Sequence, residues 1–163
     1  MVTFAAARDE VQRRMEAVFA PEAFGELYPG VQAPKVYRGF PVNEPPFYCA
    51  VDEIVDSART SGAASMGHAE YRFTVHVWLF AQHSSQATAA DALLAYTDAV
   101  FASVLADHTL RGSVDNSFPS VETAGTAADG SKRYTAAAAV AVECTVFSQC
   151  PAKMKEIVNA GSL

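Results

Sequence analysis

The sequence HAEYRFTVHVWLFAQ, residues 68–82, decides the fold class of this chain. Its side chains alternate between two sets with a period of two, which is typical of a β-strand. The set that fits a buried face is Tyr71, Phe73, Val75, Val77 and Leu79. The other set is mixed, and its Trp78 and Phe80 are large enough to need cover of their own. We therefore predict a strand with a core face and a second, partly apolar face that meets another chain or a helix.

A long helix is predicted directly after this strand, over residues 84–107, with Ser84 or Ser85 as its N-cap. Its predicted apolar stripe is Leu93, Leu94, Thr97, Val100, Phe101, Val104 and Leu105. A small, acidic stripe opposite contains Asp91 and Asp98, spaced seven apart on one face. We expect that face to be solvated or to meet a neighbouring subunit.

The rest of the chain predicts one further helix, four further strands and three loops. The helix is expected over residues 3–20, and the strands over 35–40, 47–54, 114–121 and 132–147. Segments rich in proline, glycine or small polar residues predict loops over 21–34, 56–67 and 122–131. The order α-β-β-β-α-β-β lacks βαβ alternation, so we predict an α+β fold: a mostly antiparallel sheet with two helices packed on one face. Residues 1–150 form a single domain in this prediction, and residues 151–163 form a tail that is a short helix or frayed.

Composition excludes several classes of protein. The chain has 163 residues, of which 50% are hydrophobic and 18% are charged, and its formal net charge is −6. High apolar content argues against intrinsic disorder, and the excess of acidic residues argues against a broad electrostatic grip on DNA. We expect no signal peptide and no membrane span. Because so little of the chain is charged, part of its surface is expected to be hidden against other subunits.

The residues that carry chemistry form no recognisable catalytic or metal motif. Cys49, Cys144 and Cys150 are odd in number and lack CxxC spacing, which predicts free thiols in a reducing compartment. Among the four histidines no pair makes a local metal clamp, so neither a metal nor a cofactor is predicted. Asp52 and Glu53 lie in a small acidic cluster, which is a solvated strand end or, alternatively, the acid–base pair of a small α+β enzyme.

Element order and three segments carry a resemblance to a known family. The segment AADALLAYTDAVFASVLADHTLRGSV, residues 89–114, runs from a long helix through Leu-Arg-Gly into a strand. The alternating strand YRFTVHVW, residues 71–78, precedes it, and a long hairpin ending in residues 134–147 follows. Over residues 1–148 this pattern resembles the tail terminator (tail completion) proteins of long-tailed bacteriophages, including the lambda-type terminator, and their relatives in phage-like particles.

The resemblance implies a structural virion protein and no enzyme. Family members form a hexameric ring that caps the tail tube, stops its polymerisation and joins the tail to the head. The implied partners are further copies of the chain, the tube protein and the head connector, with DNA only as passing cargo and no membrane. The implied location is the virion tail or neck, after assembly in the host cytoplasm. Another neck, head–tail joining or minor tail protein is the alternative within the same class.

Specific residues are expected to serve this role. The predicted subunit interface comprises Trp78, Phe80, Ala136 and Ala138. Two loops, residues 57–67 and 123–131, are expected to make axial contacts through Arg59, Met66, Asp129 and Lys132. Asp91 and Asp98 are expected to line the lumen, where negative charge discourages DNA from sticking.

Overall fold

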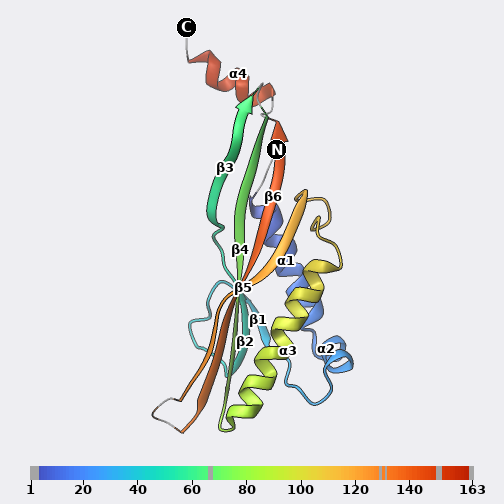
Figure 1. Cartoon of the computed structure of the whole chain (residues 1–163), viewed down its shortest axis with the longest axis vertical. Helices are drawn as coiled ribbons and strands as arrows, with labels where there is room; N and C mark the ends of the chain where they lie inside the picture. Colours follow the sequence, from blue (N-terminus) through green and yellow to red (C-terminus); the bar gives the residue numbers. More distant parts are fainter. Residues whose placement is uncertain (1–3, 66–67, 129, 131, 150–151, 162–163) are drawn as a thin grey trace.

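A computed structural model describes residues 4–65, 68–128, 130, 132–149 and 152–161 of the chain (Figure 1). A six-stranded sheet forms its centre, in the order β1-β2-β4-β6-β5, with β3 also paired to β4. The strands are β1 Lys35–Arg38, β2 Phe47–Val51, β3 Asp56–Ser65, β4 His68–His83, β5 Asn116–Ala128 and β6 Tyr134–Gln149. The helices are α1 Phe4–Val18, α2 Pro21–Leu27, α3 Gln86–Leu105 and α4 Ala152–Ala160.

The α+β class and the mostly antiparallel sheet are confirmed. Among the strands that the structure describes, β1 and β2 pair in parallel and every other pair is antiparallel. β4 and β6 are antiparallel over their whole length, from His68 opposite Gln149 to His83 opposite Tyr134. Neither strand contains glycine or proline, so nothing in their sequences interrupts the ladder. β2 and β3 share one edge of β4, with β2 pairing with residues 77–81 and β3 with the other end of the strand.

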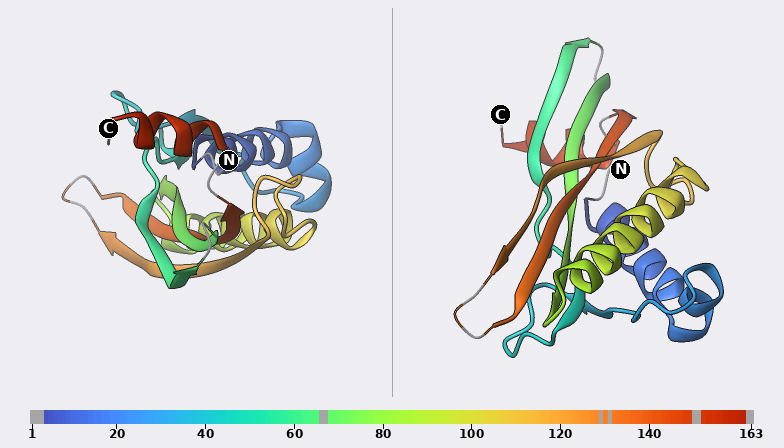
Figure 2. Two further views of the ribbon diagram at one scale, coloured as in Figure 1. Left: turned by 90° about the horizontal axis from the view of Figure 1, so that it is seen from above. Right: turned by 60° about the horizontal axis from the view of Figure 1, so that its bottom comes forward.

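Two helices cover one face of this sheet, as predicted. Figure 2 shows α1 and α3 on the same side of the curved sheet. The predicted core face of β4 is confirmed for Phe73, Val75, Val77 and Leu79, whereas Tyr71 is only partly buried. The core residues of β6 are Ala136, Ala138, Val140, Val142, Cys144 and Val146. The alanines of β6 are small, which lets α3 pack closely against the strand.

The inward face of α3 is rotated about the helix axis relative to the predicted apolar stripe. Its buried residues are Ala89, Ala92, Leu93, Tyr96, Ala99, Val100 and Val104. Leu94 and Leu105, expected in the buried stripe, are instead 67% and 62% exposed. α3 is long and apolar enough to cross a membrane by length and composition alone, and one of its faces is buried against the sheet. Its N-cap is Ser85, whose Oγ accepts a hydrogen bond from the backbone N–H of Thr88 at 3.3 Å.

A buried arginine joins the two covering helices. Arg14 of α1 is 8% exposed, and its Nη1 donates to the carbonyl oxygens of Ser103 at 2.7 Å and Asp107 at 2.9 Å. Its Nη2 lies 3.0 Å from Oδ2 of Asp107, and its Nε donates to Glu10 at 3.0 Å. The guanidinium therefore satisfies carbonyls at the C-terminal end of α3, where a helix favours positive charge.

The three predicted loops are where the structure departs from the sequence patterns. Residues 21–34 contain α2, because Pro21 occupies the first turn of a helix, where a missing N–H costs nothing. The predicted loop 56–67 is mostly strand β3, paired with β4. β5 continues to Ala128, through most of the predicted loop 122–131. The tail contains the helix α4, which was one of the two alternatives.

Candidate functional site

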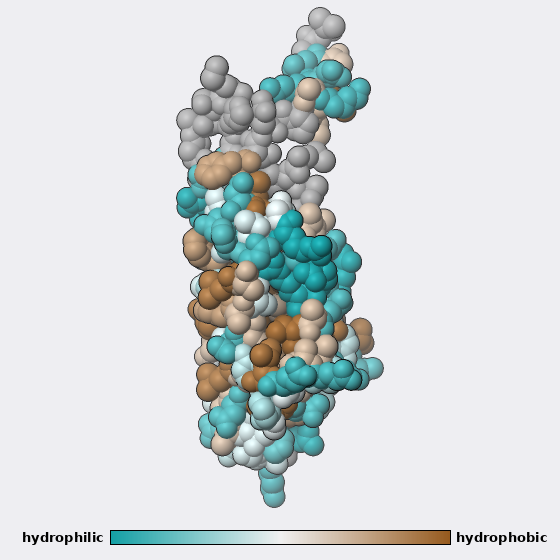
Figure 3. All heavy atoms as spheres, turned by 90° about the vertical axis from the view of Figure 1, so that its right-hand side faces the viewer, coloured by the Kyte–Doolittle hydropathy of each residue, from teal (hydrophilic) through white to brown (hydrophobic). Residues whose placement is uncertain are grey.

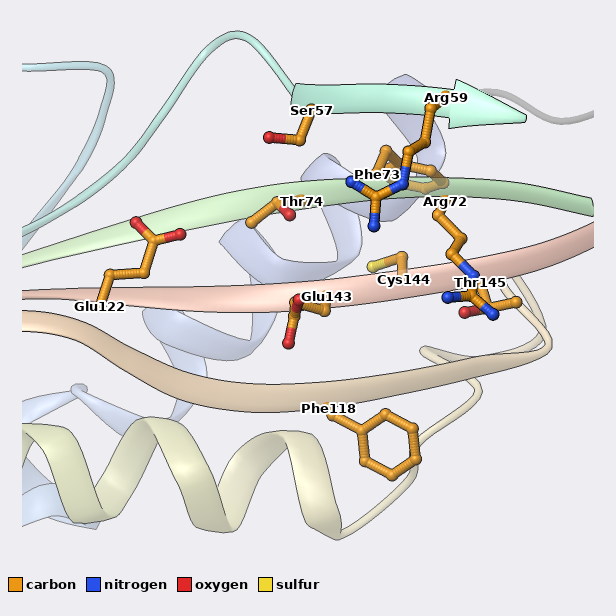
Figure 4. A pocket seen from close by; sticks show the side chains of 10 residues that line it. All are labelled: Ser57, Arg59, Arg72, Phe73, Thr74, Phe118, Glu122, Glu143, Cys144 and Thr145. Atoms are coloured by element: carbon orange, nitrogen blue, oxygen red, sulfur yellow. The ribbon is translucent and has the colours of Figure 1, made fainter. Parts of the chain in front are cut away.

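The sheet face opposite the helices carries a shallow polar hollow of about 340 Å³. Its lining residues are Ser57, Arg59, Arg72, Phe73, Thr74, Phe118, Glu122, Glu143, Cys144 and Thr145 (Figure 4). Arg59 of β3 lies directly opposite Arg72 of β4, and Arg72 is paired with Glu70 at 2.6 Å. The hollow combines positive and negative groups, unlike the largely apolar pockets that bind small molecules.

Neither described thiol is an activated nucleophile. Cys144 borders the hollow, but its Sγ donates to the carbonyl of Val142 at 3.5 Å, and burial raises its pKa to about 12. Burial also raises the pKa of Cys49. Both thiols are therefore protonated at neutral pH and inert, as free buried cysteines commonly are. The prediction that these two cysteines are free thiols is confirmed, whereas the reducing compartment stays a prediction. Cys150 lies outside the described residues.

One buried histidine has a carboxylate partner that the sequence patterns did not reveal. Nε2 of His76 lies 2.8 Å from Oε2 of Glu122, and the His76 ring stacks on Trp78 at 5.9 Å. Glu122 reaches His76 because β5 bulges between Val121 and Thr123, leaving Glu122 out of the pairing register. Ala141 lies between them on β6, opposite His76. Sequence analysis missed the His76–Glu122 pair because it placed Glu122 in a loop. Glu122 comes near β4 only because β5 pairs with β6.

Asp52 and Glu53 have structural partners instead of a catalytic setting. Oδ1 of Asp52 accepts a hydrogen bond from the backbone N–H of Ile54 at 3.2 Å. Glu53 is paired with Arg38 at 3.0 Å and with Arg8 at 3.4 Å. Neither carboxylate borders the hollow described above, so the acid–base interpretation gains no support from the geometry.

The four predicted interface residues divide into two pairs. Trp78 and Phe80 lie on the sheet face away from the core, and each already has an aromatic neighbour within the chain. Phe40 packs on Trp78 at 5.5 Å, and Tyr48 stacks on Phe80 at 4.9 Å. Ala136 and Ala138 are 0% and 4% exposed and belong to the core beneath α3. Because their side chains are interior to the chain, the prediction that these two alanines contact another subunit is wrong.

The two predicted axial-contact residues that the structure describes, Arg59 and Lys132, lie toward opposite ends of the β4–β6 ladder. The turn between β3 and β4 precedes His68, and the turn between β5 and β6 precedes Tyr134. His68 and Tyr134 are at opposite ends of the β4–β6 ladder, roughly 50 Å apart at a strand rise of about 3.4 Å per residue. Arg59 lies on β3, and Lys132 is exposed beside the other turn. Met66 and Asp129 lie outside the described residues.

The two aspartates predicted to line a lumen lie on the outward face of α3. Asp98 accepts a hydrogen bond from the Tyr28 hydroxyl, which follows α2. Burial and this bond raise the pKa of Tyr28 to about 12, so the hydroxyl stays protonated. Asp91 borders a second hollow, of about 460 Å³, together with His83 and the segment 29–32. Within the described residues, no group of three or more His, Cys, Asp or Glu side chains is placed to hold a metal.

Exposed apolar side chains are the most distinctive surface feature. Hydrophobic patches interrupt the polar surface on the side that carries α2 and α3 (Figure 3). Leu27, Leu94 and Leu105 are among the exposed large residues of these helices. α4 projects from the far end of the sheet (Figure 1), and all its residues are exposed, including Met154, Ile157 and Val158. Surfaces of this kind are expected on a subunit that assembles with other chains.

Comparisons with known proteins find a likeness among solved structures alone. No protein-family model matches the sequence, and no curated protein matches it. Among solved structures, a similar chain comes from the "Virion of native gene transfer agent (GTA) particle". The two chains share 11% sequence identity with a TM-score of 0.45, over 88% of this chain and 99% of that one.

Proposed function

We propose that this chain is a structural virion protein, a tail terminator that forms a hexameric ring on the end of a phage or phage-like tail tube. In this role it stops tube polymerisation, presents its other axial face to the head connector and lets DNA pass. It acts in the neck of the particle after assembly in the host cytoplasm.

The observation that carries this proposal is the placement of the two hairpin turns at opposite ends of the β4–β6 ladder. A ring protein between a tube and a connector needs two separate axial surfaces, and the β4–β6 ladder keeps its two ends roughly 50 Å apart. The proposal is also supported by the resemblance of residues 1–148 to the terminator family, and by exposed apolar side chains on α3 and α4.

The test combines solution mass with tube capping. Light scattering over a range of concentrations is expected to find a species of six times the 17.3 kDa chain, at least in the presence of tubes. Added to polymerising tube protein of the same virus, the chain is expected to shorten the tubes seen by electron microscopy and to label one end. A stable monomer that never caps tubes contradicts the proposal. Binding to the connector without any effect on tubes indicates another neck protein.

A further inference from the structure

The polar hollow on the outer face of the sheet contains two arginines in one row of side chains. Arg59 of β3 lies opposite Arg72 of β4, and Arg72 lies opposite Thr145 of β6. Thr145 in turn lies opposite Asn116 of β5. Side chains that face each other on paired antiparallel strands have Cβ atoms about 4.5–5.5 Å apart. Four adjacent strands therefore place two guanidinium groups, a hydroxyl and an amide in one line across the sheet, which we call the arginine row.

The positive charge of the arginine row is only partly compensated by the chain itself. Arg72 is paired with Glu70 at 2.6 Å. The Arg59 side chain is exposed and makes no hydrogen bond or ion pair with the residues that the structure describes. Figure 4 shows Arg59 reaching over β4 and Arg72 reaching toward Thr145, so both guanidinium groups border the hollow. Because like charges directly opposite each other destabilise a sheet, this pairing is unfavourable in the free chain and a bound anion would relieve it.

The acidic groups of the hollow lie outside the arginine row. Glu143 lies opposite Thr74, two residues along the strands from the row, or about 7 Å at a rise of about 3.4 Å per residue. Glu122 is held at 2.8 Å by His76, which lies two residues farther along β4. The hollow is therefore positive at the arginine row and negative beyond it. This division suits a single carboxylate at the row, whereas a chain of phosphates would also pass the negative charge of Glu143 and be repelled.

We propose that the arginine row binds a carboxylate of a protein partner, presented as an acidic side chain that enters the hollow. Guanidinium groups recognise carboxylates through paired N–H donors, and hydrogen bonds between ionised groups are about twice as strong as neutral ones. Thr145 and Asn116 supply a hydroxyl and an amide donor in the same row. The volume of about 340 Å³ admits a carboxylate side chain with several waters, at about 30 Å³ for each water. This inference concerns one surface and does not depend on the proposed ring.

The first test titrates the isotopically labelled full chain with a blocked tetrapeptide of aspartate and glutamate and follows the amide chemical shifts. Arg59→Gln and Arg72→Gln are each expected to weaken binding at least about fivefold, because each removes a charge-assisted contact. Arg111→Gln is the matched control, since Arg111 is exposed after α3 and does not line the hollow. It is expected to change binding less than about twofold. Glu143→Gln is expected to strengthen binding about twofold, because it removes a nearby negative charge.

Several outcomes of this titration overturn the proposal. Equal weakening by Arg111→Gln and Arg59→Gln indicates attraction to net charge alone. Equal binding of a tetrapeptide of asparagine and glutamine shows that no carboxylate is recognised, and weaker binding by Glu143→Gln shows that the charges of the hollow do not act as described. Tighter binding of a short oligothymidylate through the same arginines assigns the row to nucleic-acid phosphates instead of a protein carboxylate.

The second test separates a binding role of Arg59 from a structural one. A structural arginine stabilises the fold, so its loss lowers the melting midpoint, whereas Arg59 faces the like charge of Arg72. Arg59→Gln is therefore expected to leave the midpoint unchanged or to raise it by about 1–2 °C while it weakens peptide binding. Calorimetry on the same samples measures the midpoint. A lowered midpoint together with weaker binding assigns Arg59 a structural role and overturns the proposal.

Discussion

Arg14 links α1 to α3, and its substitution should weaken the contact between these two helices. From its position on α1, the Arg14 guanidinium donates hydrogen bonds to two carbonyl oxygens and one carboxylate at the C-terminal end of α3. Arg14→Ala leaves these groups without their partner and is expected to cost about 2–3 kcal/mol of unfolding free energy. For a chain of this size the melting midpoint then falls by roughly 5–10 °C, measurable by calorimetry.

The neighbouring Arg13 supplies the control for this prediction. Arg13 is also paired with Glu10, at 2.7 Å, but its side chain is half exposed and bonds nothing on α3. Arg13→Ala should therefore leave the midpoint almost unchanged. An equal loss in the two variants would show that the link between α1 and α3 contributes nothing.

Asp107 predicts how stability depends on pH. The Thr109 hydroxyl, the backbone N–H groups of Arg111 and Thr109, and the positive charge of Arg14 hold the pKa of this carboxyl well below its ordinary value near 4. A carboxyl whose pKa is lower in the folded chain than in the unfolded chain stabilises the fold at pH values above its ordinary pKa. This stabilisation is lost as the pH falls from the ordinary pKa through the folded-state pKa. Asp107→Asn should therefore lower the melting midpoint at pH 7 and make less difference at pH 2.5. A deficit that is constant across these pH values contradicts the assignment.

At the scale of the element, α4 should be dispensable for folding. Every residue of α4 is exposed, so truncation after Gln149 removes no buried contact of that helix. We expect the truncated chain to unfold within about 0.5 kcal/mol of the full chain in a urea titration. A much larger loss would show that α4 packs on its own subunit.

Periodicity predicted the elements whose burial follows a regular pattern. β4 and its core face were predicted because its alternating large apolar residues coincide with the core. For α3 the pattern predicted the helix but not which face is buried, because small alanines make up much of that face. β3 and the second half of β5 were missed because Gly62, Gly125 and several alanines have low β-propensity. These segments are strands because the long neighbours β4 and β6 offer them a ladder of partners. Sequence patterns do not report that kind of support.

The candidate surfaces were harder to predict than the elements. Hydrophobicity alone placed Leu94 and Leu105 in the core stripe, because a sequence pattern does not distinguish an exposed leucine from a buried one. Ala136 and Ala138 were assigned to an interface for the same reason, although they lie beneath α3. The pairing of His76 with Glu122 could not be predicted from the sequence, because the bulge at Glu122 depends on how β5 pairs with β6.

At the scale of the whole molecule, substitutions near the two ends of the β4–β6 ladder should impair binding to different partners. Under the proposed function, Arg59→Glu reverses a charge in the half of the ladder near the β3–β4 turn, and Lys132→Glu does so beside the β5–β6 turn. Each variant is expected to weaken binding to one axial partner, tube or connector, by about tenfold and to leave the other within about twofold. Pull-down titrations with each partner measure this. If both variants impair the same partner, the two turns do not serve opposite faces.

The β4–β6 ladder also has a mechanical consequence. The hydrogen bonds of an antiparallel pair run perpendicular to the strands, so tension applied along them loads the bonds in shear. With sixteen residue pairs in register and no glycine or proline among them, many bonds share that load at once. A force that pulls the two strands apart along their length must break these hydrogen bonds together. A force that peels one strand from the other, starting at one end, breaks them one by one. The fold is therefore expected to resist tension best when it is applied along the β4–β6 ladder.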